Sequence, residues 1–382
     1  MTDKITFSAS NSLKLAPNQL NRRMKYKISI ICISLRPGGT ERIVSRVANF
    51  LERNYEVSVI LLSSASPFYP LNTGVTLVQP SLPARSRAGA VWYVGMTKYL
   101  WRSLGKARPD IVLCFGEAIA PAVITLARLR ATGVFVFNRA SPLSSLRGVR
   151  GVVNPLTYPL AEKIVVQTYL STKLMRRRYM LSRFSVLPNP IDMPSSVRPI
   201  KERSPLIINV GSLGGRKNQR SLMRVFSRLE RTKGWSLEFV GDGPDRTALE
   251  KFSEGLKTSD TVHFLGHRSD VSDLLQNSPI FAFTSLTEGF PNALAEAMAA
   301  GCACISYDCP TGPAELIDHG VNGFLVSSGD EFQYLRLLQR LIDDGQLRET
   351  FSRNARESMK QFEASAVLSK LERMIESTIE GK

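Results

Sequence analysis

The pattern of apolar and polar positions divides the chain into two series of short apolar runs separated by amphipathic stretches. In the first series, runs that are apolar on both faces, as in strands buried in a parallel sheet, lie at 27–35, 56–62, 110–115, 133–138 and 163–168. After the first run, Ile43, Val47 and Leu51 recur at helical spacing. The first half of the chain therefore predicts strands that alternate with helices.

A linker separates the two series. Leu187–Asp192 holds two prolines close together, and a polar stretch follows it. Beyond the linker, apolar runs predict further strands at 205–211, 236–241, 261–266, 279–285, 302–306 and 323–327. Strands that alternate with helices on both sides of a linker predict two doubly wound α/β domains.

The expected domain boundaries follow from this division. Residues 25–189 form an N-terminal Rossmann-like domain, residues 190–360 form a C-terminal one, and residues 361–382 form an amphipathic final helix. Residues 1–24 are mostly polar and are expected to be a disordered extension. They lack the apolar core of a signal peptide, and the chain has no apolar run of about 18 residues. We therefore expect a cytoplasmic protein without a spanning helix.

Composition argues against a structural metal. The five cysteines form no CxxC pair, and the three histidines do not join them at the spacing of a zinc site. In a chain without an export signal, these cysteines are expected to be reduced thiols. The sequence therefore predicts no metal.

Positive charge is concentrated in the first half of the chain. Residues 1–189 contain 27 Lys and Arg against 7 Asp and Glu, whereas the whole chain has a net charge of +17. A basic aromatic stretch at 85–108 includes Trp92, Tyr93, Tyr99 and Trp101, and a second basic stretch covers 172–184. Such segments suit an anionic bilayer surface, and the alternative is a solvated face whose aromatic rings lie in the core. We expect the N-domain to dock on the inner face of the membrane.

The candidate for chemistry in the second half is the stretch Glu288–Glu296. Pro291 suits the first position of a helix, and the free amides of a helix start can hold a phosphate. A fully helical path from Glu288 to Glu296 would rise about 12 Å. Carboxylates that share a glycosidic bond in a hydrolase lie about 5–9.5 Å apart. The spacing favours contacts with two ends of a long ligand, such as a nucleotide-sugar, although a surface helix with solvated glutamates is the alternative.

The residues around these glutamates resemble the retaining glycosyltransferases of family 4, which have the GT-B fold. The resemblance runs over Ser285–Val326 and includes EGFPNALAEAMAAG and DCPTGPAELIDHGVNGFLV. It implies two Rossmann-like domains facing across a cleft, with a C-terminal helix that packs back on the N-domain. It implies that Glu288 approaches the sugar and that Glu296 holds the ribose hydroxyls. It also implies that the backbone just after Glu288 contacts the sugar and the phosphates. The residues concerned are Gly289, Phe290, Pro291 and Asn292.

Two more segments of the second half, NVGSLGGRKN and FLGHRSDV, are similar to the family. The family usually has an Arg and a Lys that hold the diphosphate. Lys217 matches the Lys, whereas Ser212 stands where the Arg is expected. Arg216 is the candidate to supply the missing charge. His267 stands in the loop that meets the nucleobase, and a purely structural role is the alternative.

In the first half, PGGTERIV resembles the GGAERV element of the family. Gly38 and Gly39 would let the backbone approach the donor phosphate closely. Many family members have an N-domain His near the reacting sugar, but residues 1–262 contain no His. The segment FNRASP ends the comparable strand, so Asn138 and Arg139 are the acceptor-side candidates.

The resemblance implies a hexosyltransferase that moves a sugar with retention from a UDP-hexose or UDP-N-acetylhexosamine. The acceptor would be a glycan or lipid-linked saccharide in surface polysaccharide biosynthesis, with Glu288 and Lys217 as catalytic residues. Since the chain contains no DxD motif, we expect metal-independent transfer without a cofactor, with the nucleotide-sugar as co-substrate. The alternatives are a GT-B-like sugar-nucleotide epimerase and a basic nucleic-acid-binding protein. The sequence shows no known DNA or RNA module, so we expect no nucleic-acid partner.

Overall fold

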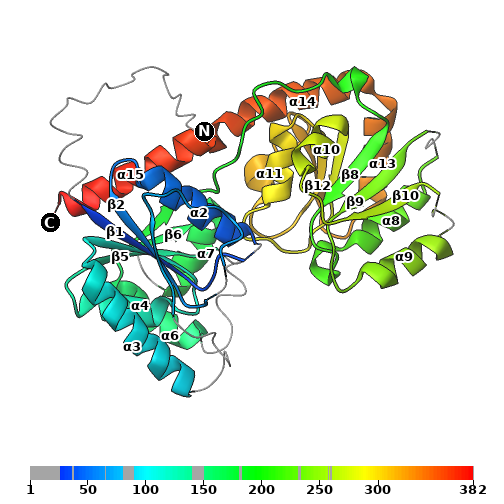
Figure 1. Cartoon of the computed structure of the whole chain (residues 1–382). Coiled ribbons are helices and arrows are strands. Elements are labelled where there is room, and N and C mark those ends of the chain that lie inside the picture. Colours follow the sequence, from blue (N-terminus) through cyan, green and yellow to red (C-terminus); the bar gives the residue numbers. More distant parts are fainter. Residues whose placement is uncertain are drawn as a thin grey trace.

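The computed structural model describes residues 26–381 except 37, 65, 81–89, 140–149, 180–182, 231–233, 257 and 259. The extension expected at 1–24 lies outside these residues. The described chain folds into two α/β domains, each built on a parallel sheet (Figure 1). This confirms the predicted pair of doubly wound domains.

The N-terminal sheet has, within the described residues, seven parallel strands in the order β3-β2-β1-β4-β5-β6-β7. Its strands are β1 (Lys27–Cys32), β2 (Glu56–Leu61), β3 (Thr76–Val78), β4 (Ile111–Phe115), β5 (Gly133–Phe137), β6 (Lys163–Val166) and β7 (Phe184–Val186). The strands β3 and β7 were not predicted, because each has only three residues and shows no periodicity. The helices of this domain are α2 (Gly39–Leu51), α3 (Ala90–Ala107), α4 (Ala120–Arg128), α6 (Arg150–Thr157), η1 (Tyr158–Leu160) and α7 (Tyr169–Tyr179).

The C-terminal sheet has six parallel strands over the residues described, in the order β10-β9-β8-β11-β12-β13. They are β8 (Leu206–Val210), β9 (Ser236–Val240), β10 (Val262–Gly266), β11 (Ile280–Phe283), β12 (Ala303–Asp308) and β13 (Gly323–Ser327). The helices up to β13 are η2 (Ile200–Glu202), η3 (Gly215–Lys217), α8 (Gln219–Ser227), α9 (Arg246–Gly255), α10 (Val271–Asn277), α11 (Asn292–Ala299) and α12 (Pro313–Leu316). The helices after β13 are α13 (Glu331–Asp343), α14 (Gly345–Met359), η4 (Lys360–Phe362) and α15 (Ala364–Ile379).

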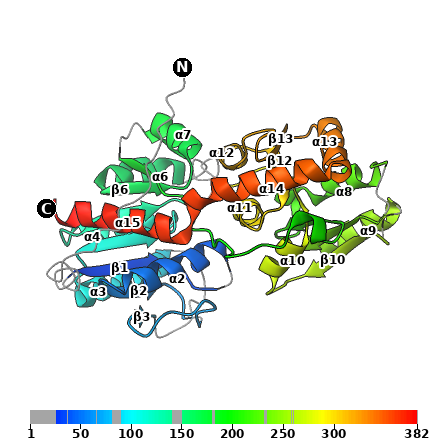
Figure 2. The ribbon, with the colours of Figure 1, turned by 90° about the horizontal axis from the view of Figure 1, so that it is seen from above.

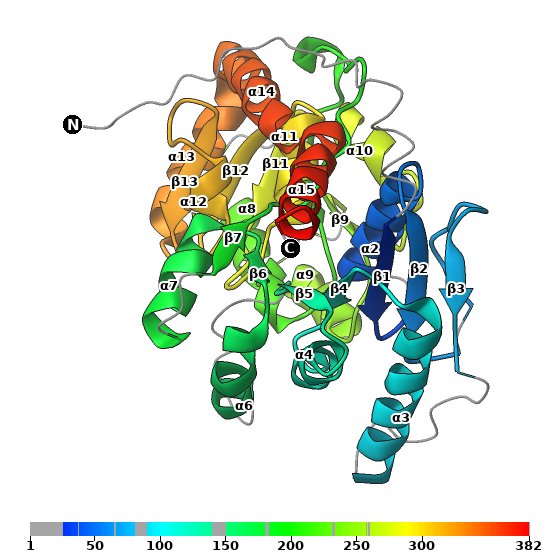
Figure 3. The same ribbon diagram turned by 90° about the vertical axis from the view of Figure 1, so that its left-hand side faces the viewer.

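Helices cover both faces of each sheet, and the buried apolar residues therefore form two clusters per domain. In the N-domain, α2 and α15 pack on one face, while α3, α4 and α7 pack on the other (Figure 3). No helix in the described part of the chain combines the length and the apolar character needed to cross a bilayer.

The final helix α15 belongs to the N-domain core, although the chain reaches it from the C-domain (Figure 2). Its buried residues Leu371 and Ile375 join the cluster formed by α2, β1 and β2. Beside the linker, the Ile191 amide donates to the Phe362 carbonyl at 2.8 Å, and the Ala364 amide donates to Ile191 at 3.0 Å. The two chain crossings between the domains therefore lie side by side and brace each other.

We predict that Leu371→Ala lowers the free energy of unfolding by about 2–5 kcal/mol, because it leaves a cavity at a fully buried position. Urea denaturation measures this change. Arg373→Ala, at an exposed position on the same helix, is the control. An equally small effect of both substitutions would contradict the placement of α15 in the N-domain core.

Candidate active site

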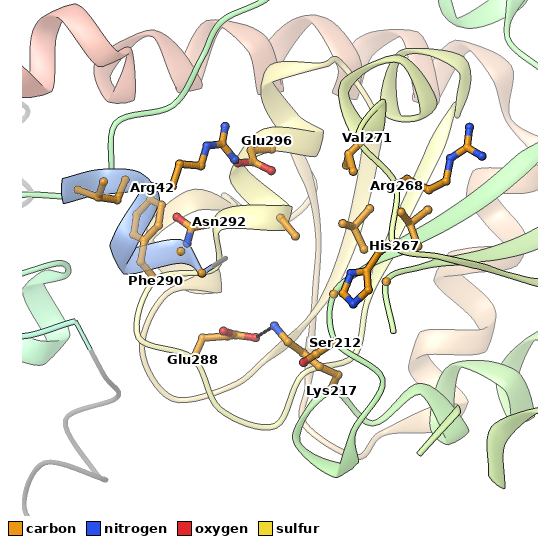
Figure 4. Close-up of a pocket in the computed structure, with 18 of the residues that line it drawn as sticks. Arg42, Ser212, Lys217, His267, Arg268, Val271, Glu288, Phe290, Asn292 and Glu296 are labelled. Atoms are coloured by element: carbon orange, nitrogen blue, oxygen red, sulfur yellow. Dashed lines mark hydrogen bonds and ion pairs between the residues drawn. The ribbon is translucent and has the colours of Figure 1, made fainter. Parts of the chain in front are cut away.

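A cleft of about 480 Å³ lies between the two domains, at the carboxyl ends of their strands. Loops and helix starts of both domains line it, including Gly38, Gly39, Arg42, Arg46, Ser212, Lys217, Asp242, His267, Arg268, Glu288, Phe290, Asn292 and Glu296 (Figure 4). Its volume is in the range of small-molecule sites. Such clefts at the carboxyl ends of parallel strands are the usual ligand sites of open α/β sheets.

Lys217 and Glu288 form an ion pair at the bottom of the cleft as drawn in Figure 4, with Nζ 2.7 Å from Oε1. Their side chains are 23% and 14% exposed, so water screens this pair less than a surface pair. Lys217 Nζ also lies 5.4 Å from the centre of the Phe283 ring. The cation of this pair can stabilise negative charge that develops on a reacting group, and the carboxylate can accept hydrogen bonds from a bound ligand.

The loops that carry Lys217 and Glu288 are tied together by backbone contacts. The Thr284 hydroxyl donates to the Lys217 carbonyl at 3.0 Å, and the Leu286 amide donates to Arg216 at 2.9 Å. The Thr311 hydroxyl donates to the Glu288 carbonyl. The strands β8 and β11 are neighbours in the sheet, and these hydrogen bonds connect the loops that follow them.

The prediction that Pro291 is the first residue of the helix is wrong by one position. Helix α11 begins at Asn292, and Pro291 precedes it with φ −81° and ψ 75°. Gly312, at φ 124°, approaches the Pro291 ring so closely that a Cβ there would overlap it. Glu288 lies in the loop before α11 and Glu296 lies within the helix, so the two are not on one continuous helix.

A second ion pair crosses the cleft from one domain to the other. Nη1 of Arg42, on α2 of the N-domain, lies 2.8 Å from Oε1 of Glu296 on α11. Arg42 Nη2 is also 3.4 Å from Asp192 of the linker. Arg46, one helical turn later on the same face, binds Asp192 and donates to the Pro190 carbonyl at 3.1 Å. The N-domain therefore contributes two guanidinium groups to a site that the sequence placed mainly in the C-domain.

The structure brings most of the predicted donor-site residues to the cleft. Gly38, Gly39, Lys217, His267, Glu288, Phe290, Asn292 and Glu296 all line it. Gly289 and Pro291 adjoin these residues in the chain but are not among the lining residues described, and nor is the exposed Arg216. Ser212 does line the cleft. The individual roles of these residues stay predictions.

The acceptor-side candidates Asn138 and Arg139 are not among the described residues that line the cleft, but Arg139 reaches it through other side chains. Arg139 Nη1 donates to Asn189 Oδ1 at 2.5 Å, and Asn189 Nδ2 donates to Asn292 Oδ1 at 2.6 Å. Burial lowers the pKa of the Arg139 guanidinium to about 9, and its Nε has no hydrogen-bond partner among the described residues. Asn138 is buried, and its amide contacts the Met175 sulfur at 3.5 Å.

Sequence reasoning missed the residues that join the domains around this cleft. Asn189 also accepts a hydrogen bond from Gln167 at 2.8 Å. Glu315, on α12 of the C-domain, accepts the first backbone amides of α7 in the N-domain, those of Tyr169 at 2.9 Å and Leu170 at 2.8 Å. The sequence offers little indication of these contacts. Asn189, between two prolines, is typical of a turn, and the sequence around Glu315 does not indicate which residue it contacts.

Comparisons with known proteins agree with this arrangement. Residues 37–193 match the family model described as Glycosyltransferase Family 4, and residues 195–358 match the one described as Glycosyl transferases group 1. The chain is 31% identical over 247 residues to the lipopolysaccharide 1,6-galactosyltransferase of Salmonella typhimurium, which covers 63% of this chain and 67% of that one.

A second relative comes from Campylobacter jejuni and is named as a GalNAc-alpha-(1->4)-GalNAc-alpha-(1->3)-diNAcBac-PP-undecaprenol alpha-1,4-N-acetyl-D-galactosaminyltransferase. It is 24% identical over 350 residues, which are 89% of this chain and 96% of that one. Among solved structures, HepE of Anabaena in complex with UDP and glucose has a TM-score of 0.75 at 18% identity. The alignment covers 92% of this chain and all of that one, and it shows that the two share a fold.

We predict that Asn189→Ala lowers the free energy of unfolding by about 1–3 kcal/mol, because it leaves buried donors and acceptors without partners. Urea denaturation measures the loss. Asn354→Ala is the control, since this amide makes one surface hydrogen bond to the Val321 carbonyl. If both substitutions had the same effect, the Asn189 bridge would contribute nothing beyond an ordinary surface contact.

Proposed function

Because this chain belongs to the family 4, group 1 glycosyltransferases, we propose that it transfers a sugar from a UDP-sugar with retention of configuration. The donor would be a UDP-hexose or UDP-N-acetylhexosamine, and the acceptor a glycan or lipid-linked saccharide of a surface polysaccharide. The observation that carries this proposal is the cleft, which collects the two glycines, the lysine and the two glutamates of the predicted donor site. The names of the Salmonella and Campylobacter relatives support the acceptor class.

The order of groups along the cleft supports a donor that lies across it. Lys217 and Glu288 meet at one end, while Glu296 lies at the other end beside Arg42 (Figure 4). We assign the diphosphate to Lys217 and the backbone of Gly38 and Gly39, and the ribose to Glu296. His267, on the wall opposite Asn292, would meet the nucleobase. The UDP in the HepE complex supports uridine as the base.

The proposed chemistry exchanges one bond for another on the same face of the sugar. The bond from the anomeric carbon to the diphosphate oxygen breaks, and a bond from that carbon to the acceptor oxygen forms. The acceptor proton passes to the leaving diphosphate oxygen, so no strong protein base is needed. Lys217 stabilises the negative charge that develops on the diphosphate, and the cleft supplies orientation. With this charge met by the protein, the proposed transfer needs no metal ion and no further cofactor.

An exposed face of the N-domain is suited to a membrane surface where a lipid-linked acceptor would lie. Helices α3, α4 and α6 pack side by side there (Figure 1). Its exposed apolar residues are Tyr93, Val94, Trp101, Leu129, Val152, Leu156 and Leu160. Its exposed basic residues include Lys98, Arg102, Lys106, Arg108 and Arg128. Apolar side chains among cations are typical of binding to anionic lipid surfaces, so we place the enzyme on the inner face of the membrane.

The aromatic residues of 85–108, expected either at a membrane surface or in the core, are divided between the exposed face and the core. Trp92 and Tyr99 pack against the core, whereas Tyr93 and Trp101 are 51% and 41% exposed. Arg85 and Arg87 lie outside the described residues. In the second basic stretch, Lys173, Arg176 and Arg177 are exposed on α7.

We predict that Lys217→Ala lowers transfer by tens-fold or more, since losing one preorganised contact to developing charge costs about 2–4 kcal/mol. Release of sugar from a panel of UDP- and GDP-sugars by the purified protein identifies the donor and measures the loss. Arg220→Ala is the control, because Arg220 is an exposed arginine of α8 that is not among the described residues lining the cleft. If DNA raised the melting temperature and no nucleotide did, the proposed glycosyltransferase function would be contradicted.

We predict that the protein sediments with vesicles containing phosphatidylglycerol and much less with phosphatidylcholine vesicles. Val94→Glu with Leu156→Glu should weaken this binding at least about tenfold, because both side chains are exposed on the proposed docking face. Val321→Glu, at an exposed apolar position of the C-domain, is the control. Equal and negligible binding to both kinds of vesicle would contradict the membrane proposal.

A further inference from the structure

The donor diphosphate is anionic, so the cations of the cleft determine which residues can bind it. Among the described residues, four cationic side chains line the cleft, Arg42, Arg46, Lys217 and Arg268, together with the carboxylates Asp242, Glu288 and Glu296. A nucleotide diphosphate brings at least about two further negative charges, and binding it out of water needs cations that are free to meet them. Lys217 is the predicted cation for the diphosphate, but in the structure it is already paired with Glu288.

We propose that Arg42 of the N-domain is a second cation for the donor diphosphate, released when the donor ribose takes Glu296 from it. This inference rests on the proposed function, because it uses the assignment of the ribose to Glu296. In the structure, Arg42 Nη1 is 2.8 Å from Glu296 Oε1. Arg42 lies in the first turn of α2, next to Gly38 and Gly39, so its charge and the glycine backbone approach the cleft together.

The partners of the other arginines explain why Arg42 is the one that is exchanged. Arg46 is held by Asp192 and by the Pro190 carbonyl, both in the linker. Arg268 makes two hydrogen bonds, at 2.8 and 2.6 Å, to Asp270 on its own loop. The proposed donor takes neither of these partners. The main carboxylate partner of Arg42 is the residue that the donor would engage, and its other described carboxylate contact, to Asp192 at 3.4 Å, is longer.

The energies favour such an exchange. The side chains of Arg42 and Glu296 are 38% and 26% exposed, and water screens ion pairs of this exposure, so the pair contributes little. A hydrogen bond from a guanidinium to a phosphate is charge-assisted and frequently bidentate, and it is stronger. The ribose hydroxyls can donate to Glu296 in place of the guanidinium, so neither group is left without a partner. Donor binding would convert a direct contact between the domains into one that runs through the donor.

Ser212 offers an independent test of this role. It is an exposed, uncharged residue just after β8, and it lines the cleft on the same side as Lys217 (Figure 4). An arginine introduced at position 212 would therefore bring a guanidinium to the lysine side of the cleft from the C-domain. If Arg42 serves the diphosphate, this new cation should substitute for it.

The experiment compares uridine with UDP by isothermal titration calorimetry. For R42A we expect UDP affinity to fall at least about tenfold while uridine affinity changes less than about twofold, because only UDP carries the diphosphate. For E296A we expect both affinities to fall by similar factors. For R42A/S212R we expect UDP affinity to return to within about threefold of the unsubstituted protein. Thermal melting of each variant, S212R included, checks that it is folded.

Two results would overturn the role of Arg42. One is an R42A protein that loses uridine and UDP affinity equally or loses neither. The other is a folded R42A/S212R protein that binds UDP no better than R42A. Failure of the unsubstituted protein to bind any nucleotide would instead contradict the proposed function, so the two failures are distinguishable.

Discussion

The parallel order of both sheets is the constraint on which the rest of this molecule depends. In a parallel sheet all strands end at the same edge, so the loops that follow them gather there. Gly38 follows β1, Lys217 follows β8, His267 follows β10, and Glu288 follows β11. Because the two edges face each other across the cleft, residues far apart in the sequence reach one site. The return of α15 to the N-domain and its contact with the linker hold the edges opposite each other.

A second consequence concerns the charges at these edges. The loops carry cations and carboxylates that face a concave, partly buried space, where an unpaired charge would be costly. Each lining cation that the structure describes has an acidic partner, in its own domain, as for Lys217 with Glu288, in the linker, as for Arg46 with Asp192, or across the cleft, as for Arg42 with Glu296. The site is therefore electrostatically satisfied before any ligand arrives. A ligand that binds must offer at least equivalent partners to the groups that it separates.

The sequence predicted the fold well and the contacts between domains poorly, for different physical reasons. Buried strands such as β1 and β4 read as apolar runs because both of their faces are covered. The donor motifs are local in sequence, so Lys217, Glu288 and Glu296 could be chosen as candidates. The Arg42–Glu296 pair joins residues on different domains, and nothing in either local pattern specifies that they meet. The same holds for Glu315 and the start of α7, which come together only through the relative placement of the domains.

Arg139 was expected to face the acceptor, but in the structure its guanidinium binds another side chain of the protein. It follows β5, where a side chain is expected to enter the cleft, but the structure directs its guanidinium to Asn189. Asn189 in turn binds Asn292, the first residue of α11. If Asn189 moved away, the buried guanidinium would lose this acceptor, and an unpaired buried donor is costly. The residue that follows β5 is therefore connected, through the amide side chains of Asn189 and Asn292, to the helix that carries Glu296.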